Sequence, residues 1–513
     1  MKNVSIAPDG TEYPLPSEAD SKKEIQLLKK ITDEQRKLGR KIVAVQGMGF
    51  VGCVMATVVA DAVDKKGKPL YFVHGQQRAS KRSFYKIPLI NKGIPPVSSS
   101  DPEVPQIFHR CVKEKKNFRA TWEDYVYELA DIVVVDIQLD ATKPAFGEAE
   151  KGYCDMTAFR EGIRTLGQHI HPQCMVLVET TVPPGTCEKV VKPILEEEFT
   201  KRGLDIKKNP PLVAHSYERV MPGAHYVASI RDFWRVYSGV NKKSIDLCRE
   251  FLTNILDVKN YPLTELDNTN ASELSKVMEN SYRATNIALT LEWARFAEQI
   301  GVDLFKVREA IRKRKGTHDN LLRPSLGVGG YCLTKDPVLA NWAMSTLFGV
   351  QGSLDVAIRS VNINDTMPLH TIELIKSVIP NLRNTKIAVL GVSYLENLGD
   401  TRHSPSKTLV EFLNKDLAVV KVLDPYVEYW AELEEVKVYS KLEDILPGVD
   451  VVIFAVGHDE YRKLKPAAVV KLCGTKPLII DCSNFLSDDK IKEYHKLGCK
   501  VKGVGKGHIE KLK

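Results

Sequence analysis

The chain has 513 residues, of which 43% are hydrophobic and 27% are charged, and its formal net charge is +8. This composition is typical of folded proteins and excludes disordered and fibrous classes. The length predicts about three domains. The mild basic excess comes without a nucleic-acid-binding motif, so we expect no nucleic-acid partner. Ten cysteines without paired CxxC spacing indicate neither a metal site nor a disulfide framework, and they fit a reducing compartment.

Residues 1–40 are predicted to be an N-terminal extension. Their polar start lacks the apolar core of a signal peptide. A helix is predicted to follow, because Ile25, Leu28 and Ile31 recur at helical spacing and Gly39 is a plausible stop. The uncharged run 42–60 has the length of a membrane span. Its glycines divide it into a strand and a helix instead, so we expect no membrane partner and a cytoplasmic location.

Three further domains are predicted. In residues 41–262, the runs "KIVAVQ", "PLYFVH", "DIVVVDI" and "CMVLVET" read as buried parallel strands between helices, as in a Rossmann-like domain. Residues 263–375 are predicted to be helical, with one long helix that lacks glycine and proline until Gly301. Residues 376–513 contain five more strand candidates. The fold class is therefore α/β, with two doubly wound Rossmann-like domains joined by a central helical domain.

A glycine-rich turn follows the first strand of residues 41–262. In the sequence "VAVQGMGFVGCVMA", a strand leads into three glycines and then into a helix. In this context Gly47 makes the turn, Gly49 admits a pyrophosphate and Gly52 lets the helix pack on the strand. The helix N-terminus then offers N–H groups to the phosphates. The predicted cofactor contacts are Gly47, Met48, Gly49, Phe50, Val51 and Gly52.

The acidic residue that usually ends the next strand and binds the ribose hydroxyls is missing. The strand ends in "FVHGQQRASKR", so Gly75 and Gln76 stand where an aspartate is expected. We expect Gln76 to contact the ribose and NAD to be the cofactor. Arg78 and the neighbouring basic residues Lys81 and Arg82 keep NADP as the second choice, because cations favour a 2′-phosphate.

Seven segments, in order, resemble the UDP-glucose/GDP-mannose dehydrogenase family. They are "ETTVPPGT", "SYERVMPG", "SKVMENSYRATNIAL", "GVGGYCLTKDP", "GDTRHSPS", "DPYV" and "GVGKG", between residues 179 and 507. The resemblance, which covers roughly residues 41–510, implies an NAD-binding domain, a helical dimerisation domain and a nucleotide-sugar-binding domain. It also implies a homodimer and a role in making precursors of polysaccharides or glycoconjugates.

The implied reaction is a four-electron oxidation of the alcohol at the sixth carbon of a nucleotide sugar, with two cofactor molecules reduced. Cys332 matches the family's nucleophile, and a thiol can hold the aldehyde as a thiohemiacetal and then as a thioester. Lys276 and Asn280 match the family's lysine and asparagine. Four residues apart on one helix face, they can both aim at one oxyanion.

The remaining site residues also follow from the resemblance. Asp336 is expected to position the hydrolytic water or to hold Lys276, while Glu218 and Thr181 match groups that hold that water. The structural alternative for Glu218 is a salt bridge with Arg219. The expected substrate and cofactor contacts are Gly329 and Gly330, which would leave room for the sugar, with Arg402 and Lys335 at the nucleotide end. No metal is expected.

The sequence departs from the family at three places. Leu395 replaces a lysine that helps to hold the sugar nucleotide, "DIQLD" replaces "VPTP", and "SYER" replaces "NPE" or "SPER". A UDP-hexose and a UDP-N-acetylhexosamine both stay open as substrates, and GDP-mannose is a further choice. Two other functions compete: a two-electron dehydrogenase of hydroxy acids, which would not need Cys332, and a nucleotide-binding scaffold that has lost its activity.

Overall fold

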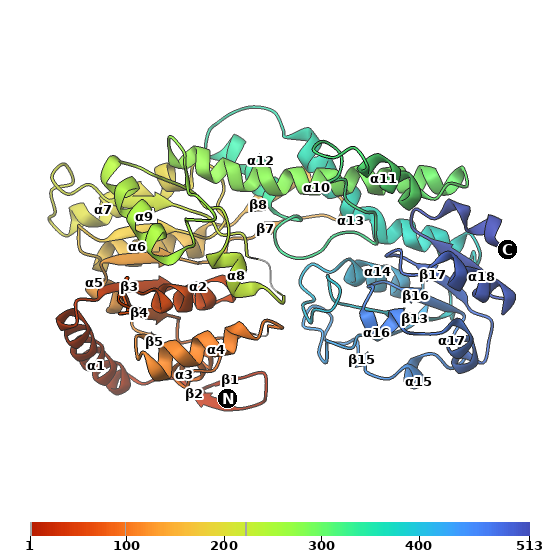
Figure 1. The fold of residues 1–513 in the computed structure, drawn as a ribbon, viewed down its shortest axis with the longest axis horizontal. Helices are drawn as coiled ribbons and strands as arrows, with labels where there is room; N and C mark the ends of the chain where they lie inside the picture. The colour runs from red at the N-terminus through yellow and green to blue at the C-terminus, as the bar shows by residue number, and fades with distance from the viewer. Residues whose placement is uncertain (1–2, 98, 221–222) are drawn as a thin grey trace. The chain divides into compact units, whose positions relative to one another are not determined.

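The chain folds into two compact units in the computed structural model, which describes residues 3–97, 99–220 and 223–513 (Figure 1). The first unit runs up to residue 141 and also contains residues 154–277 and 342–351. The second unit contains residues 142–153, 278–341 and 352–513. Within the described residues, no helix is long and apolar enough to cross a membrane, so the run 42–60 is not a span.

An eight-stranded sheet forms the core of the first unit, in the order β12-β11-β10-β9-β6-β3-β4-β5. All neighbouring strands are parallel except β10 and β11. The bounds are β3 (Lys41–Gln46), β4 (Tyr71–Gln76), β5 (Phe118–Thr121), β6 (Ile132–Val135), β9 (Met175–Val178), β10 (Leu212–His215), β11 (Val236–Gly239) and β12 (Thr264–Glu265). The four predicted strands are confirmed. The other four have four residues or fewer and too little periodicity to be recognised in the sequence.

Helices pack around this sheet, and the most buried of them follows the glycine turn. Helix α2 (Phe50–Asp61) has nine buried residues out of twelve, which explains why its sequence is apolar on every side. The other helices are α3 (Lys86–Asn91), α4 (Glu103–His109), α5 (Val126–Leu129), α6 (Thr157–His169), α7 (Lys192–Lys201), α8 (Tyr226–Arg231) and α9 (Lys242–Ile255), with π-helical turns at Arg110–Glu114 and Cys187–Val191.

The N-terminal extension packs on the first unit's own sheet. A short hairpin, β1 (Val4–Ile6) and β2 (Glu12–Pro14), precedes the predicted helix α1 (Glu18–Lys37), and Gly39 follows its end in the left-handed conformation. Buried Glu24 accepts hydrogen bonds of 3.0 and 2.8 Å from Arg119 on β5. Thr32 lies 3.0 Å from His74 on β4, whose pKa burial lowers to about 3. Leu28 between them is fully buried.

The predicted long helix is α10 (Thr269–Gln299), which appears in green in Figure 1. Its residues belong in part to each unit, because the division falls between Val277 and Met278. Its inward side chains include Val277, Ile287, Leu291 and Ala294. Met278 and Tyr282 share the helical period, but they are more than half exposed and so form no part of the core.

A six-stranded, all-parallel sheet forms the core of residues 376–513, in the order β15-β14-β13-β16-β17-β18. All five predicted strands are confirmed: β13 (Lys386–Leu390), β14 (Val419–Leu423), β16 (Val451–Phe454), β17 (Leu478–Asp481) and β18 (Val501–Gly503). The strand β15 (Val438–Tyr439) was not predicted. The α/β fold class read from the sequence is therefore confirmed.

The helices of this half of the chain are α11 (Leu304–Arg312), α12 (Asp336–Thr346), α13 (Asp355–Lys376), α14 (Pro405–Lys415), α15 (Leu442–Ile445), α16 (Asp459–Arg462), α17 (Pro466–Cys473) and α18 (Asp488–Lys496), followed by a 3-10 helix at Gly507–Leu512. A short strand pair, β7 (Ala141–Thr142) and β8 (Tyr153–Cys154), encloses a 3-10 turn at Ala149–Lys151.

If α1 is an integral part of the first unit, truncating its buried leucine will destabilise the protein. We expect Leu28→Ala to lower the free energy of unfolding by about 2–4 kcal/mol, because a fully buried leucine leaves a cavity. Urea unfolding measures this. The control Leu38→Ala removes a side chain that is 66% exposed and should change stability by less than about 0.5 kcal/mol. Equal effects of both substitutions would contradict the packing of α1.

Candidate functional site

The glycine turn at the carboxyl end of β3 has the shape that a dinucleotide requires. Gly47 has φ of 102°, and a Cβ on Gly52 would lie 2.0 Å from the carbonyl oxygen of Gly47, so neither position tolerates a side chain. Gly49 is the N-cap residue of α2, and a Cβ added there would meet no atom within 4 Å. Gly47 and Gly52 therefore serve packing, while Gly49 borders open space at a helix N-terminus, which suits a pyrophosphate.

Next to this turn, the packing at the end of β4 bears on why no acidic residue stands at Gly75 or Gln76, where one was expected to bind the ribose hydroxyls. A Cβ on Gly75 would lie 2.5 Å from the sulfur of Met48, and Met48 is fully buried. A side chain at position 75 would therefore require the buried side chain of Met48 to move. Gln76 is buried and donates a hydrogen bond of 2.9 Å to Asp124. Its side-chain amide is thus already engaged within the protein.

The neighbouring residue Gln77 was not identified from the sequence. Its side-chain oxygen accepts a hydrogen bond of 3.0 Å from the backbone N–H of Met48, and its amide donates to Ser83 at 3.2 Å. Gln77 is half-buried and touches the glycine turn directly. It is therefore a better candidate than Gln76 for the ribose contact. The only indication of this role in the sequence was that Gln77 carries an amide one residue after the end of β4.

A cluster of buried acids lies at the carboxyl ends of β6 and β9. Burial raises the pKa of Asp136 well above its usual range, and the charges of Glu179 and Glu218 raise it further. Burial also raises the pKa of Glu179, although Arg235 donates to its carboxylate at 2.7 Å. The charge of Arg235 opposes both of these shifts, but burial outweighs it. Neither Asp136 nor Glu179 was identified as a site residue from the sequence.

The predicted residues Thr181, Glu218 and Lys276 are all buried in the first unit. The ammonium of Lys276 donates a hydrogen bond of 2.8 Å to the backbone carbonyl of Glu218 and lies 5.2 Å from the ring centre of Tyr217. The Glu218 carboxylate accepts the backbone N–H of Val220. The structure therefore brings Lys276 and Glu218 together through the backbone of Glu218.

The loop that carries Thr181 is anchored by a residue of α10. The carboxylate of Glu273 accepts the N–H of Gly185 at 2.6 Å and the N–H of Cys187 at 2.8 Å. Burial raises the pKa of Glu273 to about 7, against the effect of these hydrogen bonds. Glu273 therefore fixes the end of the segment "ETTVPPGT". Its position, three residues before Lys276, was the only sign of this in the sequence.

In the second unit, the predicted residues Asn280, Lys335 and Asp336 form one buried group. Asn280 donates to one carboxylate oxygen of Asp336 at 2.6 Å, and the ammonium of Lys335 donates to the other at 2.9 Å. The backbone N–H of Asp336 donates to the carbonyl of Cys332 at 3.0 Å. The start of α12 thus ties the cysteine loop to this polar group.

Cys332 is the exposed cysteine of the chain, and the other nine are buried. Burial suppresses thiolate formation in the others, for example raising the pKa of Cys53 and of Cys111 to about 12. A thiol must be accessible and able to ionise in order to react. Exposure therefore separates Cys332 from the structural cysteines, as the sequence predicted.

The two glycines before Cys332 have a packing role. A Cβ on Gly329 would lie 2.6 Å from the carbonyl oxygen of His403, and one on Gly330 would lie 3.0 Å from the ring of Tyr394. The N–H of Gly330 donates to the carbonyl of Arg402 at 3.0 Å. The space that we expected beside these glycines is thus filled by residues of the same unit.

Two further positions concern the nucleotide end of the predicted site. The guanidinium of Arg402 is paired with buried Asp400 through two nitrogens and lies 5.2 Å from the ring centre of Tyr331. Leu395, where the family has a lysine, is 48% exposed. The arginine is therefore held in one orientation, while the side chain that replaces the lysine faces solvent.

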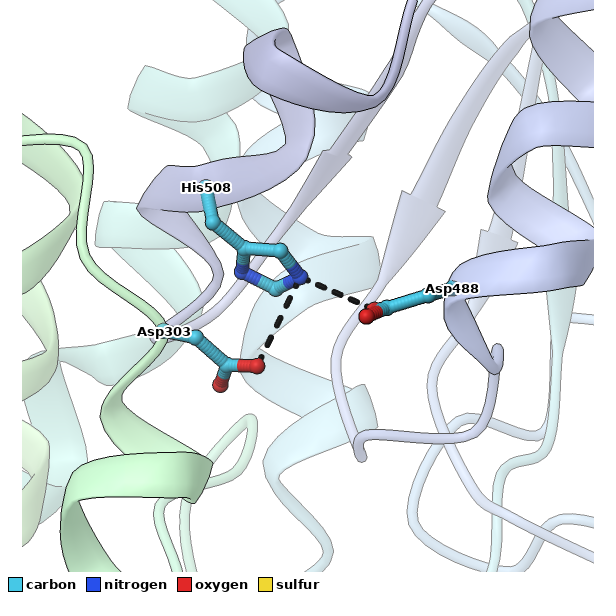
Figure 2. A group of neighbouring side chains, drawn as sticks. All are labelled: Asp303, Asp488 and His508. Carbon is cyan, nitrogen blue, oxygen red and sulfur yellow. Dashed lines mark hydrogen bonds and ion pairs between the residues drawn. The ribbon is translucent and has the colours of Figure 1, made fainter.

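Three other side chains of the second unit approach one another closely enough to hold a cation, as Figure 2 shows. The Nε2 atom of His508 lies 3.0 Å from Asp488 and 3.5 Å from Asp303. The ammonium of Lys306 lies 2.8 Å from Asp488 and 3.6 Å from Asp303. A lysine already supplies the positive charge, so we assign this cluster to an ion-pair network and not to a metal.

Comparison with known proteins gives a consistent result along the chain. Three profiles of the UDP-glucose/GDP-mannose dehydrogenase family match in order: the NAD binding domain at residues 41–252, the central domain at 270–364 and the UDP binding domain at 388–488. The UDP-N-acetyl-D-mannosamine dehydrogenase of Methanocaldococcus jannaschii is 30% identical over 69% of this chain and 75% of that protein. The enzyme of the same name from Pyrococcus horikoshii is 27% identical over 91% of this chain and 100% of that protein.

Among solved structures, the NDP-N-acetyl-D-galactosaminuronic acid dehydrogenase of Methanosarcina mazei Go1 is similar, with a TM-score of 0.77 and 29% identity. The match covers 94% of this chain and 98% of that one. A mostly parallel sheet with a glycine turn at its carboxyl edge defines a dinucleotide-binding oxidoreductase class. Within that class, the chain belongs to the UDP-glucose/GDP-mannose dehydrogenase family. It is an NAD-dependent nucleotide-sugar dehydrogenase, as the sequence predicted.

The Glu273 anchor has a consequence for pH. Because the pKa of Glu273 is raised from 4.5 to about 7 in the folded state, the native protein binds more protons than the unfolded chain in this range. Its stability therefore falls as pH rises from about 4.5 to about 7. In Glu273→Gln, which mimics the protonated acid, this fall should be smaller by about 2–4 kcal/mol.

Urea unfolding at several pH values measures the difference between Glu273→Gln and the wild type. The control Glu292→Gln alters an exposed acid of the same helix and should keep the wild-type profile. An unchanged pH profile in Glu273→Gln would contradict the assignment.

Proposed function

We propose that the chain oxidises the C6 alcohol of a UDP-N-acetylhexosamine to the carboxylate, with Cys332 as the nucleophile. The single observation that carries this proposal is the exposed Cys332 beside the buried group of Asn280, Lys335 and Asp336. The balanced reaction converts one alcohol, two NAD and one water into one carboxylate, two NADH and three protons. The glycine turn and the N-terminus of α2 would hold NAD, which would supply the hydride acceptor for both oxidations.

Cys332 acts between the two oxidations. Its thiolate adds to the aldehyde carbon and forms a thiohemiacetal, so the aldehyde is not released. Loss of a hydride from this carbon gives a thioester. Water then attacks the thioester carbon, the carbon–sulfur bond breaks, and the thiolate of Cys332 is restored. A simple two-electron dehydrogenase needs none of these steps and would not require an exposed thiol.

The polar residues of α10 stabilise charge on the substrate oxygen. Lys276 and Asn280 are one turn apart and project from one face of the helix. An ammonium and an amide held in place by buried partners can stabilise an alkoxide without reorganising. Asp336 holds the amide of Asn280 and the ammonium of Lys335, and we assign it this positioning role in addition to the predicted contact with water.

Thr181 and Glu218 are proposed to hold the hydrolytic water. Both are buried side chains of the first unit, and a hydroxyl and a carboxylate can each accept a hydrogen bond from a water molecule. The carboxyl groups of Glu179 and Asp136 lie close enough to Glu218 for its charge to raise their pKa values. This acid cluster supports a general-base role for Glu218.

The named activities of two relatives favour a UDP-N-acetylhexosamine as the substrate, and Leu395 bears on how its nucleotide is held. Two relatives that match most of their length are UDP-N-acetyl-D-mannosamine dehydrogenases. The family's UDP binding domain covers residues 388–488, which include Arg402 and Leu395. We therefore propose that Arg402 serves the sugar nucleotide, and that Leu395 leaves the nucleotide without a lysine contact at that position.

We further propose that the chain forms a homodimer through α10. Five large side chains project from one face of this helix, opposite its buried face, and Ile300 continues the stripe directly after the helix. Each is about half exposed or more: Met278, Tyr282, Leu289, Trp293, Phe296 and Ile300. A monomer rarely exposes a continuous apolar stripe of this length. A second copy of the chain, which presents the same stripe, would cover it.

We propose a functional division into an extension (1–40), an NAD-binding domain (41–262), a central dimerisation domain (263–375) and a sugar-nucleotide domain (376–513). We also propose a cytoplasmic location, where NAD and nucleotide sugars are available, and a role in making polysaccharide precursors.

The cysteine mechanism makes a stoichiometric prediction. With a UDP-N-acetylhexosamine, the wild type should reduce two NAD per sugar consumed, measured by absorbance and product analysis. Cys332→Ser should lose at least about 100-fold in turnover, because a hydroxyl is a far weaker nucleophile than a thiolate. Cys499→Ala, at a buried cysteine, is the control and should retain activity. One NAD per sugar together with an active Cys332→Ser would identify a two-electron dehydrogenase instead.

The dimer prediction concerns mass in solution. The wild type should sediment at twice the chain mass of 57.5 kDa, and Trp293→Glu should sediment as a monomer, because a charge cannot be buried in the stripe. The matched control Trp234→Glu replaces a tryptophan of similar exposure, 51% against 53%, outside α10. It should stay dimeric. A dimeric Trp293→Glu would exclude this face as the interface.

A further inference from the structure

The end of β4, beside the glycine turn, has a charge pattern that the family's NAD site does not explain. No carboxylate ends the strand: Gly75 packs against the sulfur of Met48, and both following residues are glutamines. The nearest carboxylate is that of Asp124, which follows β5, accepts a hydrogen bond from Gln76 and lies in the field of Arg78. The end of β4 itself, where an acid would bind the 2′-hydroxyl, therefore carries no negative charge.

Neutral Gln77 takes the position of that acid. Its oxygen accepts the N–H of Met48 and its amide donates to Ser83, so it bridges the glycine turn and the following loop. A carboxylate in this position accepts hydrogen bonds from ribose hydroxyls and repels a phosphate, whereas an amide repels neither. The residue that normally excludes a 2′-phosphate is thus absent.

Three basic residues lie within the five positions after Gln77. Arg78, Lys81 and Arg82 are all exposed, and within the part of the chain that the structure describes none of them has an ion pair. Ser83 donates to the carbonyl of Arg78 at 3.1 Å and lies 2.7 Å from Ser80, which folds this segment into a compact turn. Buried Phe84 anchors the turn. Arg78 and Arg82 are therefore carried by an ordered loop beside the glycine turn.

We propose that this loop binds the 2′-phosphate of NADP, with Arg78 and Arg82 as its ligands, so that the chain binds NADP at least as tightly as NAD. A phosphate needs cations and several donors, and arginine supplies both through its forked guanidinium. The inference rests on the proposed dinucleotide site at the glycine turn. It adds the discrimination at the adenosine ribose, which is independent of the hydride chemistry.

The test is equilibrium binding to the full-length protein, by calorimetry, with NADP, NAD, 2′,5′-ADP and 5′-AMP and without any sugar. We expect NADP to bind at least as tightly as NAD, and 2′,5′-ADP to bind more tightly than 5′-AMP. Arg78→Ala with Arg82→Ala should weaken NADP by tenfold or more and leave NAD within about twofold. Lys66→Ala, an exposed cation before β4, should change neither.

A reciprocal variant probes the neutral position. Gln77→Asp should lower the affinity for NADP relative to that for NAD by tenfold or more, because the new carboxylate repels the phosphate. Wild-type NADP binding more than tenfold weaker than NAD would overturn the proposal, as would arginine variants that weaken both cofactors equally. If no adenine nucleotide bound at all, the dinucleotide site itself would fail, which is a different result.

Discussion

The arrangement of the reactive residues depends on the fixed spacing of side chains along one uninterrupted helix, α10. Because an α-helix repeats every 3.6 residues, Glu273, Lys276 and Asn280 share one face. Glu273 holds the loop after β9, Lys276 holds the backbone of Glu218, and Asn280 holds Asp336. The opposite face carries the exposed apolar stripe. A glycine or proline within this helix would disturb all of these contacts at once.

Burial of charge is the main cost that these sites carry. Glu179 and Arg235 form a fully buried ion pair, and the charge of Glu218 raises the pKa of both Glu179 and Asp136. Removing charged groups from water is unfavourable unless they are paired and hydrogen-bonded. Raised carboxyl pKa values are the result, as for Glu273. Such groups are unfavourable for stability but suited to transferring protons near neutral pH.

The glycine turn shows how two distant sequence positions constrain each other. The side chain of Met48 occupies the space beside Gly75, so a side chain at position 75 requires Met48 to move. Gln77 then bridges to the backbone of Met48 from one residue further on. The end of β4 therefore differs from the usual ribose-binding end both in its packing and in its hydrogen bonds, and not only in the absence of one acid. Gly47, Gly49 and Gly52, which form the turn itself, are all present.

Local patterns in the sequence were sufficient to predict the α/β class, nine strands, α1, α10 and the glycine turn, because apolar periodicity and glycine position report local conformation directly. The ordered motifs also singled out Cys332 among ten cysteines. The short strands β5 and β10–β12 were not predicted, because four residues or fewer are too short to show an alternation of apolar and polar side chains. Gln77, Asp136, Glu179 and Glu273 escaped it too, since each acts through a residue far away in the chain. Only the tertiary structure decided which glycines face open space, which acids share a buried site and which apolar side chains of α10 stay exposed, because packing between distant segments determines all three.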